Sequence, residues 1–143
     1  MSGLGFDDSM PGVIDAKSHG IIDYVHTATN FLVGAIFHRR GDKAAAYGAY
    51  ALGASVLLNA LMTDYPLGVF KAWSFKVHGA LDYGVAAASA AIPSIVDVDD
   101  SAATFFRIQG AGESLIAGLT NYDDKSGSER ARRSAKRLFR KAA

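Results

Sequence analysis

The sequence feature that most constrains the fold of this chain is an internal repeat. Residues 17–24 read Lys-Ser-His-Gly-Ile-Ile-Asp-Tyr, and residues 76–83 read Lys-Val-His-Gly-Ala-Leu-Asp-Tyr, so Lys, His, Gly, Asp and Tyr recur 59 positions later. A second block, residues 53–65, returns in residues 110–122 at an offset of 57, with matching Gly, Ala, Leu, Thr and Tyr. Because both blocks keep their order, the sequence predicts one unit that has been duplicated.

Apolar residues gather in four long stretches, which are residues 18–38, 44–63, 77–96 and 102–120. Each stretch is close to the roughly 20 residues that an α-helix needs to cross a bilayer. The second contains no charged residue, and the other three carry only isolated polar residues. These are too few to form the wide polar stripe that every helix of a soluble bundle presents to water. We therefore predict four membrane-spanning helices rather than a soluble four-helix bundle.

Composition excludes several classes of function. Half of the 143 residues are hydrophobic and 20% are charged, which excludes a disordered chain or a charge-driven nucleic-acid binder. The absence of cysteine excludes disulfide scaffolds, thiolate zinc sites, cysteine nucleophiles and covalently attached c-type haem. The chain also has no glycine-rich phosphate loop, nucleophile elbow or zinc-protease motif, so we predict no enzymatic activity.

The repeat determines the predicted topology. Each unit holds two spans, so both copies share one orientation and are related by a pseudo-two-fold axis along the membrane normal. The predicted fold is therefore all-α, with four transmembrane helices formed by two parallel two-helix hairpin repeats, about 17–65 and about 76–122. This membrane domain, residues 18–122, follows a polar N-terminal segment, residues 1–17, and precedes a basic tail, residues 123–143.

The basic tail sets the predicted orientation. The N-terminal residues lack a secretory signal pattern, and cytoplasmic segments are the ones enriched in Lys and Arg. Both termini are therefore expected in the cytoplasm, with the spans in a bacterial inner membrane, although Arg39 and Arg40 on the other side oppose this orientation. We expect the tail to bind anionic lipid headgroups rather than nucleic acid. The lipid-binding residues are Arg130, Arg132, Arg133, Lys136, Arg137, Arg140 and Lys141.

The repeat also places the polar residues of the spans. His19 and His78 lie at equal depth near the cytoplasmic end, and an aspartate follows each of them four residues later, on the same helix face. If both faces point at the axis, two His and two Asp converge there. The predicted polar cluster comprises Asp23, Tyr24, Asp82, Tyr83 and Glu113.

Four interpretations of these residues remain open. In the structural one, each Asp accepts a hydrogen bond from its own His or from the Tyr beside it, which locks the hairpins together. In the second, His19 and His78 ligate a haem b, with Gly20 and Gly79 making room for the macrocycle. In the third, the two His and two Asp bind a divalent metal ion, although one turn of separation makes a common bonding distance awkward.

The fourth interpretation is proton or ion passage through Glu113, an acid at mid-span with no counterpart in the repeat. The alternative is that Glu113 pairs with Asn59 or Ser114 inside the bundle, or with another subunit. His26 is expected to be a hydrogen-bonded core residue.

Three motifs carry a resemblance to a known family. They are residues 63–68 (Thr-Asp-Tyr-Pro-Leu-Gly), residues 77–82 (Val-His-Gly-Ala-Leu-Asp) and residues 19–24 (His-Gly-Ile-Ile-Asp-Tyr). With these motifs the chain resembles the small bacterial integral membrane proteins of the SPW-repeat type. The Ser-Pro-Trp signature is absent, and residues 90–94 read Ala-Ala-Ile-Pro-Ser in its place. The resemblance implies a twice-repeated, four-span membrane protein and brings no established activity.

The sequence thus favours a small structural or accessory integral membrane protein, a subunit of a larger membrane complex or a homo-oligomer. No cofactor or metal is part of this prediction. The alternatives are an electron carrier with haem b held by His19 and His78, and an ion pathway through Glu113.

Overall fold

The computed structural model describes residues 12–124, 133, 136–137 and 139–141. Its main elements, in chain order, are α1 (Ala16–Arg40), α2 (Lys43–Met62), β1 (Thr63–Asp64), β2 (Trp73–Ser74), α3 (Phe75–Ile95) and α4 (Asp100–Leu119). The two strands are two residues each and pair in parallel within the connection between α2 and α3. The four apolar stretches of the sequence therefore correspond to the four helices, with ends that differ by only a few residues.

Short polar side chains set where the helices begin. Asp15, Asp42, Ser74 and Asp99 stand directly before the four helices, and each accepts a hydrogen bond from the backbone N–H three residues further on. Such a cap satisfies one of the free donors of the first helical turn. Gly41 ends α1 in the left-handed conformation, with φ at 88°, which favours glycine. Because α2 begins two residues later, α1 and α2 form a tight antiparallel hairpin.

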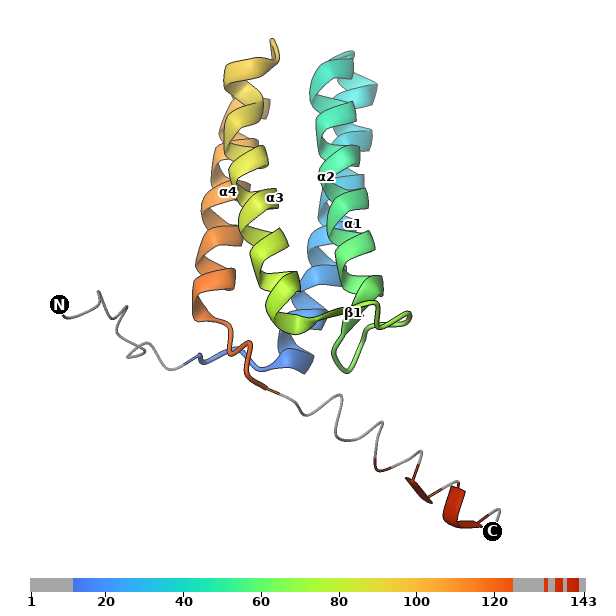
Figure 1. Cartoon of the computed structure of the whole chain (residues 1–143). Helices are drawn as coiled ribbons and strands as arrows, with labels where there is room; N and C mark the ends of the chain where they lie inside the picture. Colours follow the sequence, from blue (N-terminus) through green and yellow to red (C-terminus); the bar gives the residue numbers. More distant parts are fainter. Residues whose placement is uncertain (1–11, 125–132, 134–135, 138, 142–143) are drawn as a thin grey trace, which may run out of the picture.

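The helices form two hairpins, α1 with α2 and α3 with α4, which pack together (Figure 1). The start of α1 and the end of α4 meet at one end of the bundle. There, the backbone N–H of Ile14 donates to the carbonyl of Leu119 (3.1 Å), and that of Asn121 donates to the carbonyl of Ile14 (2.9 Å). The longer α2–α3 connection lies at this same end, and the two short helix connections lie at the other (Figure 1). The prediction of two helix hairpins is thereby confirmed.

The interior of the bundle has an apolar half and a polar half. Near the short connections, a tightly packed apolar cluster is formed by Phe37, Ala45, Ala46, Ala49, Leu52, Ala102 and Phe106. Toward the opposite end, the buried residues are mainly His, Asp, Asn and Thr. The candidate functional residues of the sequence lie in this polar half.

One helix in the described part of the chain, α2, combines the length and the apolar composition that crossing a membrane requires. The predicted lipid-binding tail is only partly described. Arg130 and Arg132 lie outside the described residues, as do residues 1–11 of the polar N-terminal segment. The remaining tail residues of that prediction are helical and exposed: Arg133, Lys136, Arg137, Arg140 and Lys141.

Candidate functional site

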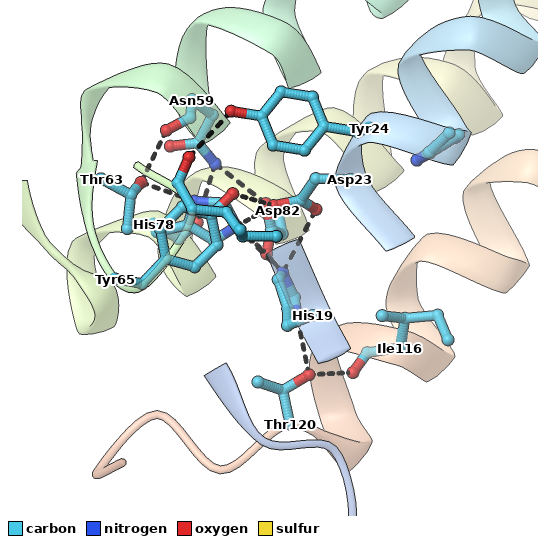
Figure 2. A network of polar contacts seen from close by, with 12 residues as sticks. His19, Asp23, Tyr24, Asn59, Thr63, Tyr65, His78, Asp82, Ile116 and Thr120 are labelled. Atoms are coloured by element: carbon cyan, nitrogen blue, oxygen red, sulfur yellow. Dashed lines mark hydrogen bonds and ion pairs between the residues drawn. The ribbon is translucent and has the colours of Figure 1, made fainter. Parts of the chain in front are cut away.

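The four repeated His and Asp residues meet between the two hairpins. His19 and Asp23 come from α1, His78 and Asp82 come from α3, and each residue is at most 3% exposed. The two imidazoles face each other, with their Nε2 atoms 2.9 Å apart (Figure 2). The helix faces that carry the repeated motif therefore do point at one another, and we call these four residues the His–Asp centre.

Both carboxylates lie against both imidazoles. Asp23 places one oxygen 3.4 Å from Nε2 of His19 and the other 3.4 Å from Nε2 of His78. Oδ2 of Asp82 lies 3.2 Å from Nε2 of His19 and 3.1 Å from Nε2 of His78. Each imidazole thus contacts the carboxylate of its own helix and that of the other hairpin. This crossed arrangement joins α1 to α3.

Two threonines fix the protonation of the outer imidazole nitrogens. The hydroxyl of Thr63 donates its one proton to a backbone carbonyl one turn back (2.6 Å), and it lies 2.7 Å from Nδ1 of His78. The hydroxyl of Thr120 likewise donates its proton to the carbonyl of Ile116 (2.7 Å), and it lies 2.8 Å from Nδ1 of His19. Since each hydroxyl has already donated its proton, each Nδ1 must carry a hydrogen and donate it. The threonine of each repeat therefore orients the histidine of the other.

With both Nδ1 atoms protonated, the two Nε2 atoms point into the centre. Two nitrogen lone pairs cannot face each other at 2.9 Å without repulsion, so a proton or another cation must lie between them. The carboxylates of Asp23 and Asp82 also require a nearby proton or other cation, because a buried negative charge is costly unless a positive charge compensates it. The centre is therefore built around positive charge.

Two tyrosines hold the carboxylates from outside. The hydroxyl of Tyr65 donates to Oδ2 of Asp23 (2.9 Å), and that of Tyr122 donates to Oδ2 of Asp82 (3.3 Å). Burial raises the pKa of both phenols, and the nearby carboxylate charge raises it further, so they remain protonated donors. These tyrosines follow α2 and α4 at equivalent positions of the repeat.

The repeated glycines make room for these tyrosine rings. A Cβ at Gly20 would come within 2.9 Å of Cε2 of Tyr65, and a Cβ at Gly79 would come within 2.5 Å of Cζ of Tyr122. A larger residue at either position would push the ring away from its carboxylate. The repeated His-Gly pair is thus explained by a close approach of helix and ring.

The centre departs from symmetry at one position. The side-chain amide of Asn59 donates to Oδ1 of Asp82 (2.9 Å), and its oxygen accepts a hydrogen bond from Nε1 of Trp73 (3.0 Å). The repeat places Ile116 at the equivalent position, where no such donor exists. Asp82 therefore receives one hydrogen bond more than the repeat alone would supply.

The tyrosines expected in the polar cluster are not the ones that form it. The hydroxyl of Tyr24 donates to the carbonyl of Leu67, and Tyr83 is half-exposed on the outside of the bundle. Of the two donors predicted for each Asp, its own His or the Tyr beside it, the His lies close, at 3.4 Å for His19–Asp23 and 3.1 Å for His78–Asp82, and the Tyr lies elsewhere. Sequence reasoning missed the roles of Tyr65 and Tyr122, although both lie in the second repeated block.

Glu113 also lies outside the His–Asp centre. Its Oε2 is 2.7 Å from Nδ1 of His26. The sequence predicted Asn59 or Ser114 as the partner inside the bundle, and the structure shows His26 in their place. This pair borders a cavity of about 420 Å³ between α1 and α4, which is lined mostly by apolar side chains. Gln109 lines the same cavity, and neither polar atom of its buried side chain has a hydrogen-bond partner among the described residues.

A haem does not fit the His–Asp centre. Two axial imidazoles bind iron from opposite faces, so at bond lengths of about 2 Å their nitrogens lie about 4 Å apart with the macrocycle between them. Here the two Nε2 atoms are 2.9 Å apart, and both carboxylates crowd the same space. The room expected at Gly20 and Gly79 is filled by tyrosine rings. The geometry of the centre therefore does not favour His19 and His78 as haem ligands.

Comparison of the chain with protein families, with curated proteins and with solved structures finds no match. The resemblance to the SPW-repeat type therefore stays a prediction that depends on the three motifs alone. Function has to be inferred from the arrangement of the side chains.

Proposed function

We propose that this chain is a small integral membrane protein of four membrane-spanning helices, with a structural or accessory role and no enzymatic activity. The observation that carries this proposal is the distribution of polar and apolar side chains in the bundle. Among the described residues, twelve polar or charged side chains are buried inside it beside fifteen hydrophobic ones, and many large apolar residues are exposed on its outside. A water-soluble bundle has the opposite distribution.

The inverted distribution appears on every helix. Asn30, Ser89 and both centre histidines are at most 1% exposed. Leu32 on α1 is 64% exposed, and Ile108 on α4 is 67% exposed. Further large apolar residues on the outer faces of the helices are Val25, Leu58, Leu81 and Leu115. Apolar cover of this extent is favourable in lipid and unfavourable in water.

Helix length agrees with this proposal. The helices have 20 to 25 residues, and at a rise of 1.5 Å per residue even 20 residues span about 30 Å, the thickness of a bilayer core. The inward-facing polar residues lower the mean hydropathy of α1, α3 and α4 without exposing a charge to lipid. Arg107 is an exposed charge on α4, about two turns from its start, where a long side chain reaches the interface.

The His–Asp centre supports the structural part of the proposal. Polar contacts within it link α1 to α3, Thr120 links α4 to α1, and the carboxylates receive further donors. In lipid these groups have no water as an alternative partner, so they favour one arrangement of the two hairpins. We assign the protein to a bacterial inner membrane, with both termini cytoplasmic and the basic tail on anionic lipid. Its partners would be a larger membrane complex or further copies of itself.

Ion passage through Glu113 receives less support. Glu113 is paired with His26, and beyond them the interior changes to the apolar cluster around Phe37 and Phe106. A conducting path needs polar groups or water along its whole length. Past this pair the buried polar side chains are scattered: Asn30 and Ser89 donate to backbone carbonyls, and Gln109 has no partner among the described residues, so these side chains form no continuous polar path.

Single-cysteine labelling tests the membrane proposal, because the natural chain contains no cysteine. Leu32→Cys and Leu115→Cys place a thiol on the apolar outer face, whereas Ala72→Cys and Asp97→Cys place it in exposed connections at opposite ends. In membrane vesicles, we expect a polar maleimide to label the Ala72 and Asp97 variants, one from each side, and to leave the other two unlabelled. Labelling of Leu32→Cys and Leu115→Cys as fast as the connection variants would contradict the proposal.

A further inference from the structure

The distances within the His–Asp centre match those between ligand atoms that share one metal ion. Ligands about 2.0–2.1 Å from an ion lie about 2.9 Å apart at a right angle and about 3.4 Å apart at the tetrahedral angle. The five nitrogen–nitrogen and nitrogen–oxygen separations of the centre run from 2.9 to 3.4 Å, and Asp23 approaches the two imidazoles through different oxygens. Ligand atoms of His19, Asp23 and His78 all lie within 4.8 Å of one another. Asp82 is not part of this close group, although its Oδ2 lies 3.2 Å and 3.1 Å from the two Nε2 atoms, so a small shift of its carboxylate would complete the set.

We propose that His19, Asp23, His78 and Asp82 bind one divalent transition-metal ion, with Zn²⁺ the best fit. Two imidazole nitrogens and two carboxylate oxygens form a donor set that suits Zn²⁺, Mn²⁺ or Fe²⁺. The double positive charge of the ion balances the two buried carboxylates, so the occupied centre is neutral. The ion takes the place of the proton that must otherwise separate the two Nε2 atoms.

The surroundings of the centre prepare it for a metal. Thr63 and Thr120 accept the Nδ1 hydrogens, which leaves the Nε2 lone pair of each imidazole as the ligand atom. Metal-bound histidines in proteins usually donate their other ring N–H in this way, and such contacts fix the tautomer and the ring orientation. Tyr65 and Tyr122 hold the carboxylates at the same time.

The side-chain geometry removes the difficulty that the spacing in the sequence raised. One turn separates His19 from Asp23, which makes it awkward for one helix alone to bring both to an ion. In the structure one turn does bring both to the centre, because Oδ1 of Asp23 lies 3.4 Å from Nε2 of His19, and Oδ2 of Asp82 lies 3.1 Å from Nε2 of His78. The site is thus a property of the pair of hairpins, and it does not depend on whether lipid surrounds them.

Metal titration of the purified full-length protein tests this proposal. After treatment with a chelator, we expect the wild-type chain to bind one Zn²⁺ or one Co²⁺ per chain in competition with a chromophoric chelator. His78→Ala and Asp82→Asn should each lower the affinity more than about 100-fold, since losing an outer-sphere partner alone costs about 10- to 100-fold. Thr63→Val and Thr120→Val should fall within that smaller range. His38→Ala, an exposed histidine far along α1, is the matched control and should bind as the wild type does.

The test does not depend on every variant folding. If His78→Ala loses its helical circular dichroism, the wild-type chain loaded with one Cu²⁺ decides the matter by electron paramagnetic resonance. Hyperfine splitting from two imidazole nitrogens supports the site. The proposal is overturned if the wild type does not bind one metal ion per chain. It is also overturned if folded His19→Ala and His78→Ala each bind the metal as tightly as the wild type does. The metal titration does not depend on the cysteine-labelling experiment. The metal site can therefore be refuted without refuting the membrane proposal, and the reverse also holds.

Discussion

At the scale of single residues, the centre depends on what surrounds the four central side chains. Gly20 and Gly79 allow the rings of Tyr65 and Tyr122 to reach the carboxylates. Because the same combination of glycine, tyrosine and aspartate occurs in both hairpins, its effect can be tested with the smallest substitution available, a single methyl group.

We expect Gly79→Ala to destabilise the protein by about 1–3 kcal/mol, because the added Cβ overlaps the ring of Tyr122 and forces it away from Asp82. Gly84, on the same helix, is the matched control, since a Cβ there meets nothing within 4 Å. Gly84→Ala should be neutral or stabilising by up to about 1 kcal/mol through helix propensity. Thermal unfolding in detergent measures both. A Gly79→Ala protein as stable as Gly84→Ala would show that the ring contact has no energetic weight.

At the scale of helices and hairpins, the repeat predicts much of the arrangement. The motif with His at i and Asp at i+4 predicts that these residues share one face of each helix, and the apolar stretches predict the four helices. That the two faces meet is known from the structure alone. The donors to the aspartates could not be predicted, because Tyr65 and Tyr122 lie beyond the ends of their helices. Their approach depends on how the chain folds back, which the periodicity of a helix does not encode.

The partner of Glu113 was missed for a different reason. His26 and Glu113 have no counterparts in the other repeat, so symmetry gives no information about either. They meet across α1 and α4, helices of different hairpins that are distant in the sequence. Only the packing of the hairpins reveals this pair.

A double-mutant cycle tests the His26–Glu113 pair. His26→Leu and Glu113→Leu should each destabilise the protein by about 1–3 kcal/mol, since each leaves a buried polar partner unsatisfied. The double variant should be more stable than the sum of the two losses predicts, because it removes both polar groups together. Unfolding in detergent gives the three values. Strictly additive losses would mean that the two side chains do not interact.

At the scale of the whole molecule, the bundle combines an interior that is polar in one half with an outside rich in large apolar residues. A duplicated hairpin explains both features, since two copies of one polar motif satisfy each other inside while their outer faces stay apolar. The buried polar residues lie mainly toward the end that holds the α2–α3 connection, and the apolar cluster fills the other half. The central claim is therefore that the two copies meet with their histidines oriented by each other's threonines.

Nitrogen-15 NMR of the four histidines in the metal-free protein tests this claim most directly, because so few signals can be assigned by single substitutions. We predict that His19 and His78 both carry a hydrogen on Nδ1 that exchanges slowly with solvent, and that Thr120→Val disturbs His19 while Thr63→Val disturbs His78. In the His78→Ala protein, Nε2 of His19 should shift because its neighbour at 2.9 Å is gone. An unprotonated or rapidly exchanging Nδ1 on either histidine would contradict the account.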